Sequence, residues 1–113
     1  MRVLIIDDSP SILECTRTFL EKAGHAVVTA SSLYEAALLY PYECDVVICD
    51  GFDGYGPQFL KVVRRFNPVG KTILHSADSR LVEQERERGF CAIVKGDSWA
   101  ELLEAVGDKG GVR

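Results

Sequence analysis

The chain has 113 residues, of which 47% are hydrophobic and 27% are charged, and its formal net charge is −4. This length predicts one domain with a single core, and the acidic balance argues against a nucleic-acid partner, which would select a basic surface. No apolar run approaches the roughly 20 residues of a membrane span, and the start MRVLIIDDS turns acidic too early for a signal peptide. We therefore expect neither a membrane nor a nucleic acid as partner.

The cysteines point to a cytoplasmic protein with reduced thiols. They are scattered, and no two of them form a CxxC pair. They are Cys15, Cys44, Cys49 and Cys91. This pattern predicts small hydrophobic side chains rather than disulfides or metal ligands.

Five short strand-like runs alternate with segments of helical period. Strands are predicted over residues 2–6, 25–29, 45–49, 72–75 and 91–94. Two of them, VLII and VVIC, are continuously apolar, which is typical of central parallel strands covered on both faces.

The first two helices have clear start and stop signals. The first opens at Pro10 and stops at Gly24. Its expected inner face consists of Ile12, Cys15, Phe19, Leu20 and Ala23. The second begins at the capping box formed by Ser32 and Glu35 and ends before Pro41.

Three further helices follow. The third is predicted to start at Pro57, with an inner face of Phe59, Val62, Val63 and Phe66. The fourth, over 79–88, is mostly charged, so only a narrow stripe near Leu81 and Val82 is expected inside, and EQERER at 83–88 indicates a solvated face. The fifth opens with a second capping box, Ser98 to Glu101. Its inner face is expected to contain Trp99, Leu102, Leu103 and Val106.

The alternation of strands and helices predicts an α/β fold. Right-handed crossovers give a flavodoxin-like, doubly wound (βα)5 parallel sheet with strand order 2-1-3-4-5 and helices on both faces. We expect residues 1–107 to form this domain and residues 108–113 to be a flexible tail.

Polar side chains follow four of the predicted strands. Asp7 and Asp8 come after the first strand, Asp50 after the third, Ser76 after the fourth and Lys95 after the fifth. Carboxyl ends of parallel strands meet at one edge, so the three carboxylates are expected to converge between neighbouring strands roughly 5 Å apart. Like charges this close need a cation, and Mg²⁺ prefers oxygen ligands. A carboxylate, a metal, a hydroxyl and an ammonium together favour phosphoryl transfer.

Each of these residues has an ordinary alternative role. Asp7 and Asp8 are also suited to helix capping, Asp50 before a glycine to a turn, and Ser76 to capping the helix near residue 79. Lys95 is equally suited to a solvated strand end. The ordinary roles do not explain why all five fall on the same sheet edge. His25 and His75 lie at strand ends with no partner of another ligand type, which favours structural or surface roles.

The sequence resembles receiver domains of two-component response regulators, and among them the single-domain chemotaxis regulators. The matching segments are VLIIDDS, DVVICD, TILHSA and AIVK, and the resemblance covers nearly the whole chain. It implies that Asp50 accepts a phosphoryl group from a phosphohistidine on a histidine kinase or phosphotransfer protein. It also implies that Asp8, Asp50 and the carbonyl of Phe52 ligate Mg²⁺, with Asp7 acting through water, and that Ser76 and Lys95 bind phosphoryl oxygens.

The same resemblance implies a signalling switch rather than an enzyme that turns over a separate substrate. Phosphorylation would alter the surface made by the helix over 79–88, the strand over 91–94 and the last helix, which an effector protein would read. Because little chain follows residue 106, we expect a stand-alone protein that signals by protein–protein contact.

The chain departs from the family pattern at several positions. The acceptor loop, GFDGYG, lacks the usual Met-Pro, and with Gly56 as its matching glycine it is two residues shorter. Gly96 replaces the proline that usually follows the lysine, which predicts a trans bond, and Ala92 stands where the family has a switch aromatic, with Phe90 one pair earlier. Phe52 and Asp78 occupy the two positions that tune dephosphorylation. A bulky Phe52 predicts slow hydrolysis of the phosphorylated form.

Two other functions remain open. A degenerate receiver would act as an interaction module independent of phosphorylation, as the departures suggest. A phosphatase of the haloacid dehalogenase type also uses Asp, Ser or Thr, Lys and Mg²⁺. That class needs a D-x-D pattern and a cap, whereas here the aspartates are adjacent and no length is left for a cap.

Overall fold

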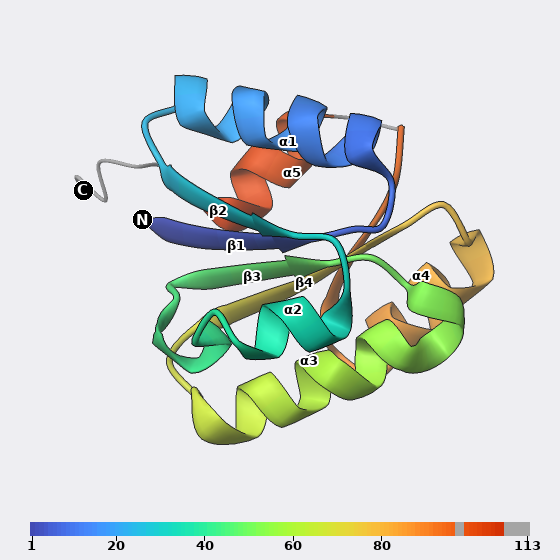
Figure 1. Cartoon of the computed structure of the whole chain (residues 1–113). Helices are drawn as coiled ribbons and strands as arrows, with labels where there is room; N and C mark the ends of the chain where they lie inside the picture. The colour runs from blue at the N-terminus through green and yellow to red at the C-terminus, as the bar shows by residue number, and fades with distance from the viewer. Residues whose placement is uncertain (97–98, 108–113) are drawn as a thin grey trace.

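The computed structural model describes residues 1–96 and 99–107. It is a three-layer α/β structure with a five-stranded parallel sheet in the middle (Figure 1). The strand order is β2-β1-β3-β4-β5, as predicted. The strands are β1 (Arg2–Ile6), β2 (Ala26–Ala30), β3 (Val46–Cys49), β4 (Lys71–Ser76) and β5 (Cys91–Val94). β1 and β3 are the two continuously apolar runs. They lie side by side in the sheet interior, where helices cover both faces.

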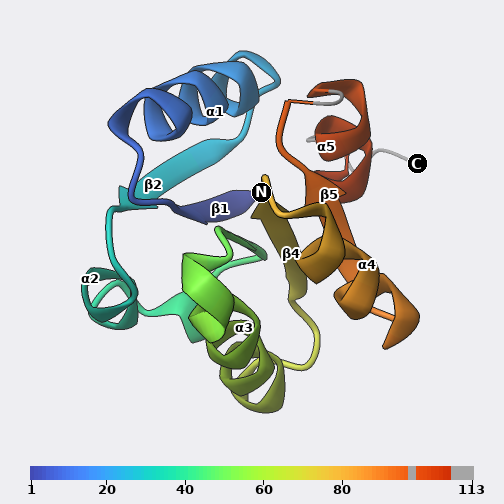
Figure 2. The same ribbon diagram turned by 90° about the vertical axis from the view of Figure 1, so that its right-hand side faces the viewer.

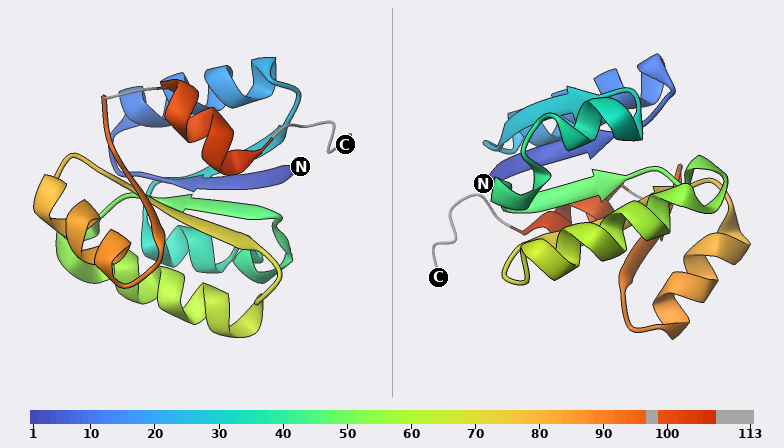
Figure 3. Two further views of the ribbon diagram at one scale, coloured as in Figure 1. Left: turned by 180° about the vertical axis from the view of Figure 1, so that it is seen from behind. Right: turned by 60° about the horizontal axis from the view of Figure 1, so that its bottom comes forward.

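Helices cover the two faces of the sheet unequally. One face carries α1 (Pro10–Lys22) and α5 (Trp99–Val106), as the view from behind in Figure 3 shows. The other face carries α2 (Leu33–Ala37), α3 (Tyr55–Phe66) and α4 (Ser79–Glu87) (Figure 2). Two short 3₁₀ turns, η1 (Pro41–Glu43) and η2 (Phe52–Gly54), flank β3. Each face has its own core cluster, centred on Leu4 and Leu74 in one and on Ile5 and Ile73 in the other. No helix in the described part of the chain is long and apolar enough to cross a membrane.

The third helix differs most from its prediction. It starts at Tyr55 rather than Pro57, and its buried positions are Gly56, Pro57, Leu60 and Val63. Val62 and Phe66, which were expected inside, are 45% and 64% exposed. The reason is the close packing of Gly56 under the preceding loop, which rotates the helix so that the stripe of Gly56, Leu60 and Val63 faces the sheet.

Other expected inner residues also lie elsewhere. In α1, Thr16 and Leu20 are buried, while Cys15 is exposed, and Cys91 is exposed on the edge strand β5. Within the predicted solvated face of α4, Glu85 is buried and paired with Arg88, at 3.1 Å between Oε1 and Nη1. Periodicity places a residue on a helix face, but the neighbouring elements decide whether that face is covered.

The helix caps use local hydrogen bonds. The Ser9 hydroxyl caps α1, a role considered for Asp7 and Asp8 instead. Ser32 accepts a bond from the Glu35 amide at the start of α2, as predicted. The reciprocal bond of this capping box goes to the amide of Ser31 rather than Ser32, at 2.6 Å from the Glu35 carboxylate. α2 ends at Ala37, well before Pro41. Ser98 of the second predicted capping box and the expected tail over 108–113 lie outside the described residues.

Candidate functional site

The sheet places the polar residues at one edge by extending its hydrogen bonds one residue past the strands. The Asp50 amide donates to the carbonyl of Ile6 at 2.8 Å, and the Asp7 amide donates to Ala30 at 3.1 Å. On the other side, the Lys95 amide donates to the Ser76 carbonyl at 2.9 Å. Because the backbone at each position is held by a neighbouring strand, the side chains begin from fixed points on the edge.

Three carboxylates meet there. Oxygen atoms of Asp7, Asp8 and Asp50 lie within 4.8 Å of one another, and the three side chains differ in exposure: Asp7 is buried, Asp50 half-buried and Asp8 exposed. Burial raises the pKa of Asp7 above its usual value, although its hydrogen bonds with Lys95 and with the Ser9 amide act in the opposite direction. This is a small volume with an excess of negative charge.

Lys95 partly compensates for that charge. Its ammonium lies 2.6 Å from Oδ2 of Asp7 and also pairs with Oδ1 of Asp50. Burial by itself would lower the Lys95 pKa, but the hydrogen bonds to Asp50 and Asp7 outweigh burial and raise it. Lys95 is therefore a cation that bridges two of the three acids, and one ammonium against three carboxylates leaves the cluster able to take a further cation.

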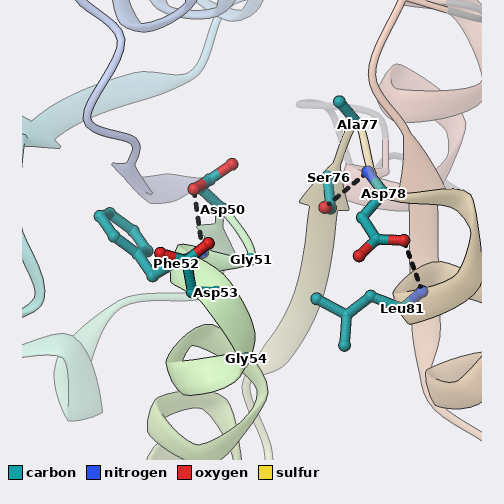
Figure 4. A pocket seen from close by; sticks show the side chains of 9 residues that line it. All are labelled: Asp50, Gly51, Phe52, Asp53, Gly54, Ser76, Ala77, Asp78 and Leu81. Carbon is teal, nitrogen blue, oxygen red and sulfur yellow. Dashed lines mark hydrogen bonds between the residues drawn. The ribbon is translucent and has the colours of Figure 1, made fainter.

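Ser76 lies across a cleft from Asp50 (Figure 4). The cleft has a volume of about 480 Å³ and extends from Asp50 and Phe52 to Ser76, Asp78 and Leu81. The buried Ser76 hydroxyl accepts a hydrogen bond from the Asp78 amide at 3.0 Å. Asp78, not Ser76, caps α4, with its carboxylate accepting bonds from the amides of Arg80 and Leu81. The capping role considered for Ser76 is therefore wrong. Its hydroxyl oxygen accepts from the Asp78 amide, and its proton can be donated elsewhere.

The loop after Asp50 is strained and closely packed. Phe52 and Asp53 both have left-handed backbone angles, with φ of 45° and 53°, which non-glycine residues rarely adopt. The Phe52 amide donates to Oδ2 of Asp50 at 3.0 Å, while its carbonyl accepts from the Tyr55 amide. A Cβ atom on Gly56 would lie 2.0 Å from the Asp50 carbonyl oxygen, so only glycine fits where α3 begins. This contact fixes the short loop against its helix.

Phe52 turns away from Ser76. Figure 4 shows its ring on the far side of the Asp50 carboxylate from the Ser76 hydroxyl. There it lines a second cleft, of about 400 Å³, together with Asp8 and Leu33. The ring therefore covers Asp50 from the side of the acids and leaves the Ser76 side open.

The region of the usual switch aromatic is built differently. Ala92 is buried, and Phe90 lies under the guanidinium of Arg64, 3.6 Å from its ring centroid. Arg64 also donates to the Thr72 hydroxyl at 2.9 Å, so Phe90 is held on the α3 side of the sheet. The bond between Lys95 and Gly96 is trans, as predicted.

Two aspects of the site have no signal in the sequence. Gly51 faces Ser76 and Leu81 so closely that an added Cβ would lie 3.0 Å from the Ser76 hydroxyl and 2.9 Å from a Leu81 methyl group.

His75, one residue before Ser76, is buried beside the Trp99 ring at a centroid distance of 6.4 Å. Burial, and to a lesser degree the charge of Lys95, lower the His75 pKa to about 4. Trp99, which was expected in the core, is 39% exposed, and its ring packs at a tilted angle against Phe19, with 5.2 Å between the ring centroids.

The donor set fits a hard divalent cation. Three carboxylates with oxygens within 4.8 Å of one another, one of them exposed, match the oxygen ligands and partial hydration that Mg²⁺ requires. A nucleophilic carboxylate flanked by a metal site, an ammonium and a hydroxyl is chemically suited to accept a phosphoryl group.

Comparisons with known proteins agree with this arrangement. The family model of the response regulator receiver domain matches residues 3–106. A receiver domain from Clostridium thermocellum is similar to the chain with a TM-score of 0.80 and 26% identity, covering 93% of this chain and 90% of that one. The response regulator TrrA of Thermotoga maritima, solved with Mg²⁺-BeF, has a TM-score of 0.80 and 28% identity, with 93% and 95% covered. A CheY-like receiver from Methanospirillum hungatei has a TM-score of 0.77 and 26% identity, with 93% and 89% covered.

The chain belongs to the response regulator receiver domain family. A search among curated proteins gave no significant match.

Proposed function

We propose that the chain is a cytoplasmic phosphoacceptor switch whose Asp50 takes a phosphoryl group from a phosphohistidine. The donor would be a sensor histidine kinase or a histidine phosphotransfer protein. The observation that carries this proposal is the clustering of the Asp50 carboxylate with Asp7, Asp8 and the ammonium of Lys95, beside an open cleft. Membership of the receiver family supports it further.

Four groups of the chain are candidates to hold Mg²⁺. Asp8 and Asp50 would bind the ion directly, the carbonyl of Phe52 would supply a third ligand, and Asp7 would act through water. The Phe52 carbonyl accepts one hydrogen bond from Tyr55 and retains a second lone pair for a cation. When bound, the ion supplies positive charge that neutralises the phosphoryl oxygens.

The chain's own residues would perform the transfer. A carboxylate oxygen of Asp50 attacks phosphorus, and the P–O bond forms as the P–N bond to the donor histidine breaks. The donor imidazole, which carries a proton on its other ring nitrogen, takes the electron pair of the P–N bond and leaves as neutral imidazole. The ammonium of Lys95, which pairs with Asp50 before transfer, would then pair with one phosphoryl oxygen. The Ser76 hydroxyl would donate a hydrogen bond to another phosphoryl oxygen across the cleft. The chain modifies only itself and is therefore a switch rather than an enzyme with a separate substrate.

The output would leave through α4, β5 and α5. The Ser76 hydroxyl is bonded to the Asp78 amide at the start of α4, so its movement toward a phosphoryl group breaks that bond. Arg86 of α4 donates to the Ala92 carbonyl at 2.8 Å and pairs with Glu101 of α5 at 3.4 Å, which ties the three elements together. An effector protein on this face would read their displacement.

The direct test is phosphorylation in the presence and absence of Mg²⁺. Incubation with acetyl phosphate should add one phosphoryl group to the intact mass, and beryllofluoride should perturb the amide spectrum around Asp50 and Ser76. Asp50→Asn should abolish both responses, while Asp53→Asn, a change of the same kind three residues away, should retain them. No mass change in the wild-type protein with Mg²⁺ would contradict the proposal.

A degenerate receiver is the second candidate, and the placement of Phe90 favours it. The ring is held under Arg64, and Ala92 offers no aromatic in its place, so the usual coupling of a hydroxyl to an aromatic rotamer is missing. For such a module, the wild-type protein and the Asp50→Asn variant would bind the partner equally well. A phosphorylation-dependent change in partner affinity would exclude it.

A further inference from the structure

The exposed apolar side chains of this protein are concentrated on one side. Ten large hydrophobic side chains are exposed in the described part of the chain, and nine of them lie between β2 and the loop after α3. The exception is Trp99. Aromatic residues dominate the group, including Tyr34 of α2, which is 78% exposed, and Phe66 of α3. We call the surface of α2, η1, α3 and the loop after α3, with the adjoining edge of β2, the aromatic face.

The aromatic face is continuous. Figures 1 and 2 both show α2 and α3 side by side on the same face of the sheet, with η1 at their junction. The rings of Tyr42 in η1 and Phe66 in α3 meet edge to face, 5.6 Å apart. Tyr40 and Val28 line one cavity at the β2 end, and Tyr55 shares the cleft beside Leu33 at the other.

The size of this surface matches one half of a stable interface. Aromatic side chains contribute 150–250 Å² each when fully exposed, so these five, between 40% and 78% exposed, offer roughly 600 Å². The aliphatic members, with Val69 94% exposed, bring the surface to the ~800 Å² per partner of a standard interface. A monomer rarely exposes so large an apolar surface.

Charges on the aromatic face are complementary across it. The α2 and η1 side carries Glu35 and Glu43, and α3 carries Lys61 and Arg65, all of them exposed. None of the four forms an ion pair with another described residue. A two-fold axis between α2 and α3 would place the acidic side of one copy against the basic side of the other, as a self-complementary interface requires. A partner of another kind would need an acidic and a basic region of its own, placed opposite the basic and acidic regions of this face.

We propose that the aromatic face binds a second copy of this chain and forms a two-fold symmetric dimer. The aromatic rings form the centre, and Glu43 of each copy pairs with Arg65 of its partner at the rim. The dimer leaves the α4, β5 and α5 side uncovered, so the inference does not depend on the proposed phosphoryl transfer.

Sedimentation equilibrium of the full chain, without phosphodonor, tests this inference. We expect a dimer with a dissociation constant on the order of 10 μM or tighter. Phe66→Asp should abolish dimer formation. Because the Phe66 side chain is 64% exposed, the circular dichroism spectrum and unfolding midpoint of the variant should stay close to those of the wild type. The matched control is Glu83→Lys on the exposed side of α4, which should dimerise like the wild type.

Charge reversal identifies the arrangement of the two copies. Arg65→Glu and Glu43→Arg should each weaken self-association about tenfold, and mixing the two variants should restore a heterodimer at wild-type affinity. A monomeric mass at concentrations up to about 1 mM would overturn the proposal. So would a dimer that Phe66→Asp leaves intact, because it would use another surface.

Discussion

Asp50 has two unlike sides. Toward β1 it meets Asp7 and Asp8, so that side is crowded with negative charge. Toward β4 it faces Ser76 and Gly51, which have little volume, across an open cleft of about 480 Å³ that also reaches Asp78. We call this the cleft side of Asp50. Lys95 bridges only the charged side, from Asp50 to Asp7. The comparison shows how a single carboxylate can be supplied with a cation site on one side and room for a ligand on the other.

Acidification should destabilise the fold through His75. His75 lies behind Ser76 with its pKa lowered to about 4, from an ordinary 6.5. Above pH 6.5 both folded and unfolded states carry neutral imidazole, and below it the unfolded state binds the proton more readily. The stability contributed by this group therefore falls as the pH drops from 6.5 to 4, by about 3 kcal/mol in all.

Urea unfolding of wild type and His75→Gln across this pH range measures the effect. Asp7 acts in the opposite sense, because its pKa is raised and its protonation stabilises the folded state on acidification. The difference between the two proteins isolates His75. The two stability curves should run parallel above pH 7 and converge or cross below 6; parallel curves throughout would contradict the prediction.

Removing a charge from the crowded side should weaken cation binding. Asp8→Asn removes the exposed carboxylate of the cluster, and we expect Mg²⁺ affinity to fall about 100-fold, as measured by calorimetry. Asp53→Asn is the control, since it removes an exposed acid from the same loop and asparagine tolerates its left-handed φ of 53°. Equal losses in the two variants would mean that general charge, not ligation, governs the affinity.

Adding one methyl group at Gly51, on the cleft side of Asp50, should weaken beryllofluoride binding but not Mg²⁺ binding. The Cβ of Gly51→Ala would press on the Ser76 hydroxyl and a Leu81 methyl group. Beryllofluoride binding should weaken about tenfold, while Mg²⁺ affinity stays within about twofold of wild type. Asp53→Asn, which adds no volume to the same loop, should change neither. Parallel loss of both ligands in Gly51→Ala would show that the two sides are not separable.

The smallest effect is expected at Phe52. Its ring lies beside Asp50 on the side away from Ser76, so it would protect only part of the surface of an acyl phosphate from water. Phe52→Ala should shorten the half-life of the phosphorylated protein about threefold, equivalent to roughly 0.7 kcal/mol of barrier. Phe52→Leu, which retains the apolar bulk, should resemble wild type. If Phe52→Ala leaves the half-life unchanged, any slow hydrolysis of the phosphorylated protein must be due to another group.

Much of the fold follows from local patterns. VLII and VVIC became the two central strands because such runs are stable only when both faces are covered. The strand order then followed from short right-handed connections, and with it the shared edge for Asp7, Asp50, Ser76 and Lys95. The helix faces were harder. In α3 the predicted inner residues Val62 and Phe66 proved exposed, because a backbone contact at Gly56 sets the rotation of the helix.

By itself the sequence determined which residues end the strands, and therefore which chemistry collects at the edge of the sheet. Only the tertiary structure decided how Asp50 is surrounded. The packing of Gly51 against Ser76 and the burial of His75 arise between segments distant in the chain, and the left-handed turn at Phe52 depends on how the loop packs against the start of α3. Local periodicity carries information about one element's own faces, whereas these contacts depend on how two elements fit together in space.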